Sequence, residues 1–127
     1  MNEKFRKARA LLLYRYPYFA SAVYRMEYRV SEAVPTAGVD KWWKLYVNPA
    51  ALDAWTIEEI AGVICHEVLH LLRKHAERRQ GRLPLKWNIA ADMEINDDIT
   101  LPLPGEPIKP WDFGLSNHQT AEFYYKN

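Results

Sequence analysis

The pattern of hydrophobic and polar positions predicts four helices along the chain. Residues 3–16, rich in Ala, Leu, Lys and Arg, predict a first helix that Pro17 ends. The clearest helix begins at Thr56, because Glu59 completes a capping box and an apolar run follows without a break as far as Gly81. A third helix is predicted over residues 87–98, and a short amphipathic one over residues 118–126.

Two strands are predicted between the first two helices. Residues 18–30 are rich in aromatic and β-branched types, and their apolar side chains alternate along the chain as in a strand. The alternating positions are Tyr24, Met26, Tyr28 and Val30. Residues 41–47 predict the second strand, which Asn48 and Pro49 stop. Turn signals between the two strands are Pro35, Gly38 and Asp40.

The order of these elements predicts an α+β fold, with a short β-sheet packed against the helix of residues 56–81 and against further helices. Two strands flanked by helices, without regular βαβ alternation, are typical of that class. Four prolines between residues 101 and 112 predict an extended, irregular stretch after the third helix. A length of 127 residues is typical of one domain, so we expect residues 1–127 to form a single domain.

Composition and charge exclude several classes of protein. Hydrophobic residues make up 49% and charged residues 26%, the balance of a soluble globular domain, and the net charge of +1 argues against a nucleic-acid binder. No run approaches the roughly 20 apolar residues of a membrane span, and no signal-peptide core of about 7–15 apolar residues is present. We therefore expect a cytoplasmic protein with no nucleic-acid or membrane partner.

One motif carries recognisable chemistry, the sequence HExxH formed by His66, Glu67 and His70. Histidines four residues apart lie on one face of a helix, where both imidazoles can bind one Zn²⁺ at about 2.0–2.1 Å. Glu67 can then reach a water on the metal as a general base. The motif lies in an otherwise apolar helix, in which three titratable side chains would be costly to bury unless one metal site satisfied them all.

His75 is the obvious candidate for a third ligand, but helix geometry argues against it. At about 100° per residue, an unbroken helix places His75 roughly 160° from the mean direction of His66 and His70. Leu72 and Ala76 also occupy the positions that the metzincin class gives to a Gly and a third His. We therefore expect His75 to be a partly buried helix histidine outside the ligand set.

The third helix offers a better ligand in Asp92. Asn88, Asp92 and Asn96 recur every four residues on one helix face, and Asp92 alone carries an anionic oxygen. We expect Asp92 to complete the metal site, with Asn88 and Asn96 as hydrogen-bond partners that orient the ligands. Glu94 and Asp97 point to the other side of this helix and are expected to be solvated charges.

Two further groups of side chains leave more than one interpretation open. The basic residues at the end of the second helix suit the helix dipole and are expected to be solvated; they are Arg73, Lys74, Arg78, Arg79 and Arg82. Several side chains could donate a hydrogen bond to an oxyanion, and the sequence does not choose among Tyr24, Tyr28, Tyr124, Tyr125 and His118.

An ordered series of motifs resembles a known family. The series runs from TAGVD at residue 36 through LYVNP, HEVLHLLRKHAERR and WNIAADMEIN to a final TAEFYY. It resembles the zincin-like metallopeptidase domain that precedes a von Willebrand factor A-like domain in many bacterial proteins. The resemblance implies zinc bound by His66 and His70 and a catalytic Glu67, and it supports Asp92 as a residue of the metal site.

The sequence therefore predicts a small zinc-dependent metallopeptidase acting on a peptide or protein substrate. A strand within residues 18–30 would hold the substrate in extended form beside the metal. One alternative is a non-catalytic, zinc-stabilised adaptor that recognises a partner protein, and another is a latent peptidase whose cleft is covered by residues 101–112. Glu67 favours the catalytic interpretation, because a purely structural zinc site needs no base and more often has four protein ligands.

Overall fold

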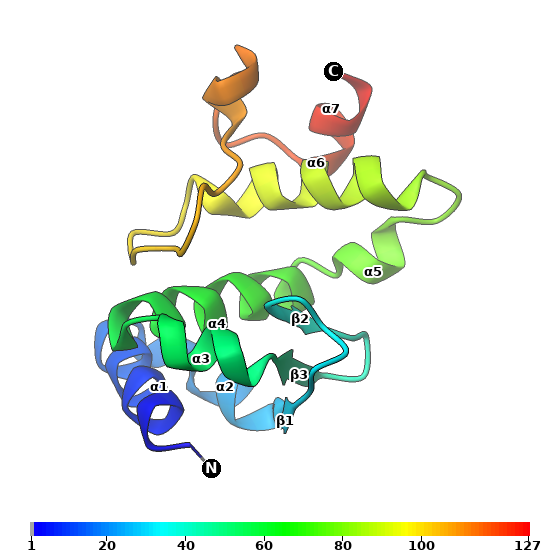
Figure 1. Cartoon of the computed structure of the whole chain (residues 1–127). Coiled ribbons are helices and arrows are strands. Elements are labelled where there is room, and N and C mark those ends of the chain that lie inside the picture. Colours follow the sequence, from blue (N-terminus) through cyan, green and yellow to red (C-terminus); the bar gives the residue numbers. More distant parts are fainter. Residues whose placement is uncertain (1) are drawn as a thin grey trace.

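The computed structural model describes residues 2–127, which form two layers (Figure 1). The first layer holds α1 (Glu3–Arg15), α2 (Ala20–Arg25), α3 (Pro49–Ala54), α4 (Ile57–Leu72) and a small β-sheet. The second layer holds α6 (Pro84–Asn96) and α7 (Ala121–Lys126), and α5 (His75–Arg78) connects the two layers. Two short 3₁₀ turns complete the chain, η1 (Pro17–Phe19) and η2 (Pro110–Phe113).

The sheet has three strands in the order β1-β3-β2. Its strands are β1 (Glu27–Val30), β2 (Ala37–Val39) and β3 (Lys44–Val47). The central strand β3 pairs parallel with β1 and antiparallel with β2, and its Leu45 and Val47 side chains are buried. A small mixed sheet among helices confirms the predicted α+β class.

One hydrophobic cluster lies in each layer. In the first, Phe5, Ala8 and Leu12 lie on one face of α1 and pack with apolar residues of α4. The second joins α6 to α7 around Trp87 and Tyr124. Helix α6 also contributes Ile95, near its C-terminal end, to the first cluster. The end of α6 is thus anchored to the first layer, whereas its N-terminal part packs on α7.

The start of α4 follows from its sequence, but its end does not. The predicted capping box is present, since the Thr56 hydroxyl accepts from the Glu59 backbone N–H while the Glu59 carboxylate accepts from Thr56 N–H. The predicted continuation to Gly81 is wrong: α4 ends at Leu72, and Lys74 adopts a left-handed conformation (φ 55°) before α5 begins. Among residues 2–127, no helix combines the length and the apolar character required to cross a membrane.

The other predicted helices are confirmed, but one predicted strand is largely wrong. Helices α1, α6 and α7 correspond to the predictions for residues 3–16, 87–98 and 118–126. Residues 18–30 form η1 and α2 before the short strand β1. The alternation of apolar residues predicted a strand that buries Tyr24. Tyr24 is instead exposed on α2, where the Arg9 guanidinium lies 4.9 Å from its ring centroid. Helix α2 instead buries Ala22 and Val23, which are adjacent in sequence.

The proline-rich segment after α6 packs closely on α4 at Gly62. A Cβ atom at this position would overlap the backbone carbonyl oxygen of Pro102 and approach the Leu103 side chain. The glycine therefore allows the segment to lie directly on the helix that carries the HExxH motif.

We expect Gly62→Ala to lower the free energy of unfolding by about 1–3 kcal/mol, because overpacking a close backbone contact forces the chain apart. Urea denaturation of the metal-free protein measures this change. Gly81→Ala is the matched control, since nothing lies within 4 Å of a Cβ built there. Equal stability of the two variants would contradict the close packing at Gly62.

Candidate metal centre

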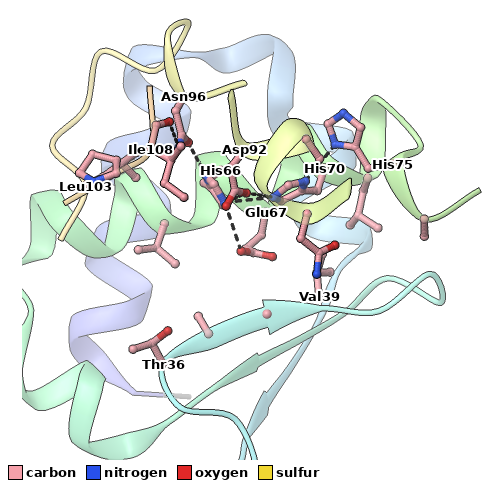
Figure 2. Close-up of a pocket in the computed structure, with 18 of the residues that line it drawn as sticks. Thr36, Val39, His66, Glu67, His70, His75, Asp92, Asn96, Leu103 and Ile108 are labelled. Carbon is pink, nitrogen blue, oxygen red and sulfur yellow. Dashed lines mark hydrogen bonds and ion pairs between the residues drawn. The ribbon is translucent and has the colours of Figure 1, made fainter. Parts of the chain in front are cut away.

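Side chains from α4 and α6 converge at one point between the two layers. His66 and His70, one turn apart on α4, face Asp92 on α6 (Figure 2). The His70 Nε2 atom lies 3.0 Å from His66 Nε2 and 3.0 Å from Asp92 Oδ1. The third side of this triangle, from His66 Nε2 to Asp92 Oδ1, is 3.3 Å. The structure thus brings together the three residues that the sequence suggested as metal ligands.

Asn96 fixes which nitrogen of His66 faces the triangle. The Asn96 amide nitrogen donates to the carbonyl oxygen of Ile108 at 2.9 Å, so its Oδ1 atom must be the one that lies 2.8 Å from His66 Nδ1. An amide oxygen can only accept, and His66 Nδ1 therefore carries the proton. The Nε2 atom of a neutral His66 is left with a lone pair directed at His70 and Asp92.

The triangle suits a divalent cation. A tetrahedral Zn²⁺ with ligand bonds of about 2.0–2.2 Å requires ligand atoms about 3.3–3.6 Å apart. The three distances found here, 3.0, 3.0 and 3.3 Å, are at or slightly below this range. Without a cation, a neutral His66 would direct its Nε2 lone pair at the Asp92 carboxylate oxygen, 3.3 Å away. Two imidazole nitrogens and one carboxylate oxygen are also a donor set typical of catalytic zinc sites, which keep a position open for water.

The electrostatics of the three side chains are strongly coupled. Burial alone would raise the pKa of Asp92, but hydrogen bonds and charge interactions with His66 and His70 hold it well below its usual range. Burial would lower the pKa of His66, but its contacts with Asp92 and Glu67 outweigh this and raise it. The pocket therefore favours positive charge at the centre of the triangle.

Glu67 lies beside the triangle and is almost fully buried. Its side chain lies between His66 and strand β2, with Oε1 3.9 Å from His66 Nε2 (Figure 2). Burial raises the pKa of the Glu67 carboxyl, against the opposing effect of the two histidines. A carboxylate in such a place is a better proton acceptor than one in water.

A groove of about 950 Å³ runs past these side chains. Strand β2 and the residues next to it, 36–40, form one wall, and the proline-rich residues 103–108 form another. Helices α4 and α6 contribute the His66, His70, Glu67 and Asp92 side chains to the same groove. A groove of this volume is large enough for several residues of an extended peptide.

Strand β2 presents a free backbone edge to the groove. Hydrogen bonds to β3 involve the Thr36 carbonyl and the Asp40 N–H, so by antiparallel alternation the N–H and C=O groups of Ala37 and Val39 point away from β3. From the sequence, we expected the substrate-binding strand within residues 18–30. That prediction is wrong, because β1 lies at the opposite edge of the sheet and does not line the groove.

His75 lies close to the candidate metal site because α4 ends at Leu72 and α5 begins at His75, whereas the predicted direction of its side chain assumed an unbroken helix. Its Nδ1 atom is 2.9 Å from Nδ1 of His70, and its side chain is buried. The contact is on the side of the His70 ring opposite Nε2, so His75 does not point at the centre of the triangle.

Glu94 and Arg78, expected to be solvated charges, instead pair with each other, with Glu94 buried and Arg78 partly buried. Glu94 is 4% exposed and accepts from the Arg78 guanidinium at 2.8 Å and from the Ala121 backbone N–H at 2.6 Å. Arg73 also donates to Glu94, at 3.1 Å. The helical phase relative to Asp92 predicted only the direction in which the Glu94 side chain points. It did not reveal that α5 and α7 cover that side of α6.

The remaining candidates from the sequence lie away from the triangle or make no contact with it. Asn88 lines the groove but is exposed, and its side chain makes no hydrogen bond within residues 2–127. None of the five oxyanion candidates lines the groove; they are Tyr24, Tyr28, Tyr124, Tyr125 and His118. His118 instead lies with Asp97 and Asp98 in a second group, in which Asp98 also binds Arg73.

The chain matches a known protein family. The model of the family described as "Putative metallopeptidase domain" matches residues 1–114, a range that includes the HExxH helix, Asp92 and the proline-rich wall. No curated protein and no solved structure matches the chain. The family match confirms the metallopeptidase resemblance inferred from the motifs, and such a family implies a metal cofactor.

The two asparagines of α6 are predicted to differ sharply in their effect on stability. Asn96→Ala should lower the free energy of unfolding by about 1–3 kcal/mol, because it leaves the Ile108 carbonyl and His66 Nδ1 without their partner. Asn88→Ala, on the exposed face, should change it by less than about 0.5 kcal/mol. Urea denaturation in the presence of a chelator separates this effect from metal binding. Similar losses in both variants would contradict the contacts assigned to Asn96.

Proposed function

The chain belongs to the putative metallopeptidase domain family, and on this premise we propose that it is a zinc-dependent peptidase. The observation that carries the proposal is the triangle of His66 Nε2, His70 Nε2 and Asp92 Oδ1, with Glu67 beside it and a groove running past. Three protein ligands leave a fourth tetrahedral position open, as catalytic zinc sites require. The substrate class is an extended peptide or protein segment.

Each residue of the site has a distinct role in this proposal. His66, His70 and Asp92 hold the ion, which when bound acts as a Lewis acid and lowers the pKa of water. Glu67 takes a proton from the attacking water as the new C–O bond forms, and then passes it to the leaving amine nitrogen as the C–N bond breaks.

The walls of the groove support the choice of substrate. The free N–H and C=O groups of Ala37 and Val39 can hydrogen-bond to an extended peptide, which would add to the sheet as a fourth strand. Such pairing fixes the peptide backbone and leaves the side chains to contact the groove. Glu67 lies on the side of the triangle that faces β2 (Figure 2), which places the base near a scissile bond held on that strand.

Zinc binding is the first test. Wild-type protein should bind one Zn²⁺ per chain and unfold at a higher temperature when loaded, because a ligand that binds only the folded state stabilises it. His70→Ala and Asp92→Ala should each lose at least about 100-fold in zinc affinity, measured by competition with a chelator. His118→Asn is the control, as this histidine is 63% exposed in the second group. One-to-one zinc retained in Asp92→Ala would contradict the ligand set.

Peptide hydrolysis is the second test. Glu67→Gln preserves shape but removes the base, so it should keep zinc while losing about 10²–10⁴-fold in cleavage rate. The assay incubates zinc-loaded protein with a mixed peptide library and identifies the products by mass spectrometry. Glu58→Gln is the matched control, an exposed residue of the same helix outside the groove.

An active peptidase and a non-catalytic or latent protein give opposite results in this assay. Zinc-loaded wild type that cleaves no more than Glu67→Gln would favour the non-catalytic adaptor or the latent peptidase. Residues 103–108 form a wall of the groove and leave about 950 Å³ open, an arrangement that supports the active form over the latent one.

A further inference from the structure

The far side of His70 makes a second set of contacts that a metal-binding role alone does not explain. Its Nδ1 atom lies 2.9 Å from Nδ1 of His75, a residue that is 4% exposed. Two ring nitrogens at this distance must share one proton, with one ring donating and the other accepting. Because a metal takes the lone pair on Nε2, His70 must carry its proton on Nδ1, and His75 Nδ1 must then be the acceptor.

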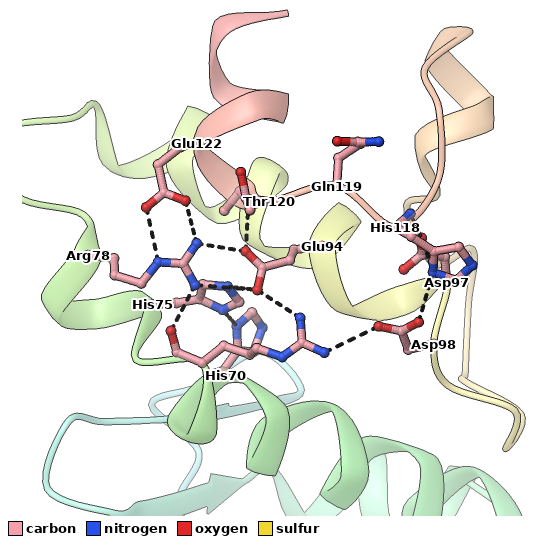
Figure 3. A network of polar contacts seen from close by, with 12 residues as sticks. His70, His75, Arg78, Glu94, Asp97, Asp98, His118, Gln119, Thr120 and Glu122 are labelled. Carbon is pink, nitrogen blue, oxygen red and sulfur yellow. Dashed lines mark hydrogen bonds and ion pairs between the residues drawn. The ribbon is translucent and has the colours of Figure 1, made fainter.

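The other nitrogen of His75 points towards a buried carboxylate. If Nδ1 accepts, a neutral His75 carries its proton on Nε2, and Oε2 of Glu94 lies 3.2 Å from that atom (Figure 3). His75 Nε2 is buried and has no aligned hydrogen bond to any described residue, so Glu94 is the acceptor within reach. The three groups form one sequence of contacts from His70 through His75 to Glu94.

The backbone around His75 holds its ring in this place. The left-handed Lys74 ends α4 and turns the chain so that His75, the first residue of α5, comes back over His70. The Trp87 indole N–H donates to the His75 carbonyl at 2.8 Å, which ties the same residue to α6. The position of the ring thus depends on the helix break and on the opposite layer together.

Glu94 is itself held from three directions. Arg78 from α5 donates to its carboxylate (Figure 3). Arg73 at the end of α4 and the Ala121 N–H of α7 donate to it as well. A carboxylate with several fixed donors has little freedom to turn. The Glu94 carboxylate can therefore hold the His75 ring in one orientation.

We propose that His75 and Glu94 are positioning residues that fix the orientation and the tautomer of His70. The proposal rests on the metal site proposed above and deepens it. Most histidine ligands donate their second N–H directly to a carboxylate or a carbonyl group. In this chain the His75 imidazole lies between His70 and the Glu94 carboxylate. Glu94 therefore acts on His70 indirectly, through His75.

A matched pair of substitutions separates positioning from packing. In His75→Asn, the amide oxygen takes the place of the ring atom Nδ1. It can therefore still accept a hydrogen bond from His70. His75→Leu has a similar branched shape but no acceptor. We expect His75→Leu to lose about 10–100-fold in zinc affinity, the effect typical of removing a ligand's hydrogen-bond partner, and His75→Asn to recover most of that loss.

A second pair tests Glu94. Arg78 contacts both Glu94 and Glu122, but only Glu94 lies near His75. Glu94→Gln should weaken zinc binding, whereas Glu122→Gln should leave it close to wild type. His118→Asn serves as the histidine control, and urea denaturation of every variant shows whether it remains folded.

A tautomer measurement on wild type keeps the proposal falsifiable even if the Glu94 or His75 variants do not fold. Ring ¹⁵N–¹H correlation spectra of the zinc-loaded protein should show the proton of His70 on Nδ1 and that of His75 on Nε2. The opposite tautomer of His75 would overturn the proposal, as would equal zinc affinity of His75→Leu and wild type, or an equal loss in His75→Leu and His75→Asn. Wild type that binds no zinc would instead overturn the metal site itself, and the positioning role with it.

Discussion

Three electron-pair donors brought within about 3 Å of one another are the constraint on which the rest of the structure depends. His66 and His70 come from α4 and Asp92 from α6, so the two helices must keep a fixed separation. Hydrophobic packing supplies this only in part: Ile95 joins the core beneath α4, whereas the other buried apolar residues of α6 pack on α7. A dication between the helices would offset the charges of Asp92 and Glu67, and its binding would therefore also stabilise the contact between the layers.

Much of the remaining contact between the layers is polar and centres on Glu94. Burial alone would raise the pKa of this carboxyl, but His75, Arg78 and the Ala121 N–H hold it well below its usual range. Removing one partner of such a cluster leaves a buried charge unsatisfied, which costs far more than losing an exposed ion pair. The cluster joins α4, α5, α6 and α7 on the Nδ1 side of His70, opposite the ring nitrogen that faces Asp92, so it supports this histidine from the side away from the triangle.

Local signals in the sequence predicted the helix that carries the motif and the side chains that face the groove. The capping box at Thr56 and the four-residue spacings of His66–His70 and Asn88–Asp92–Asn96 are short-range patterns, and a regular helix preserves them. The end of α4 was missed because Lys74 takes a left-handed conformation that usually favours Gly or Asn. Glu94 was misjudged because helix phase gives a direction and does not reveal which distant segment covers it. The strand β2 is only three residues long, and Pro35 and Asp40 at its ends resembled a turn.

The same residues contact both the proline-rich wall of the groove and the candidate metal ligands. Asn96 uses one end of its amide for His66 and the other for the Ile108 carbonyl on the proline-rich wall. The Lys109 ammonium donates to the backbone carbonyl of Asn96 at 3.0 Å. Gly62 allows Pro102 to lie directly on α4. A displacement of this wall would therefore pull on the hydrogen bond that keeps the His66 proton on Nδ1. Since that proton determines whether Nε2 presents a lone pair, the shape of the groove and the ability of His66 to bind a metal depend on each other.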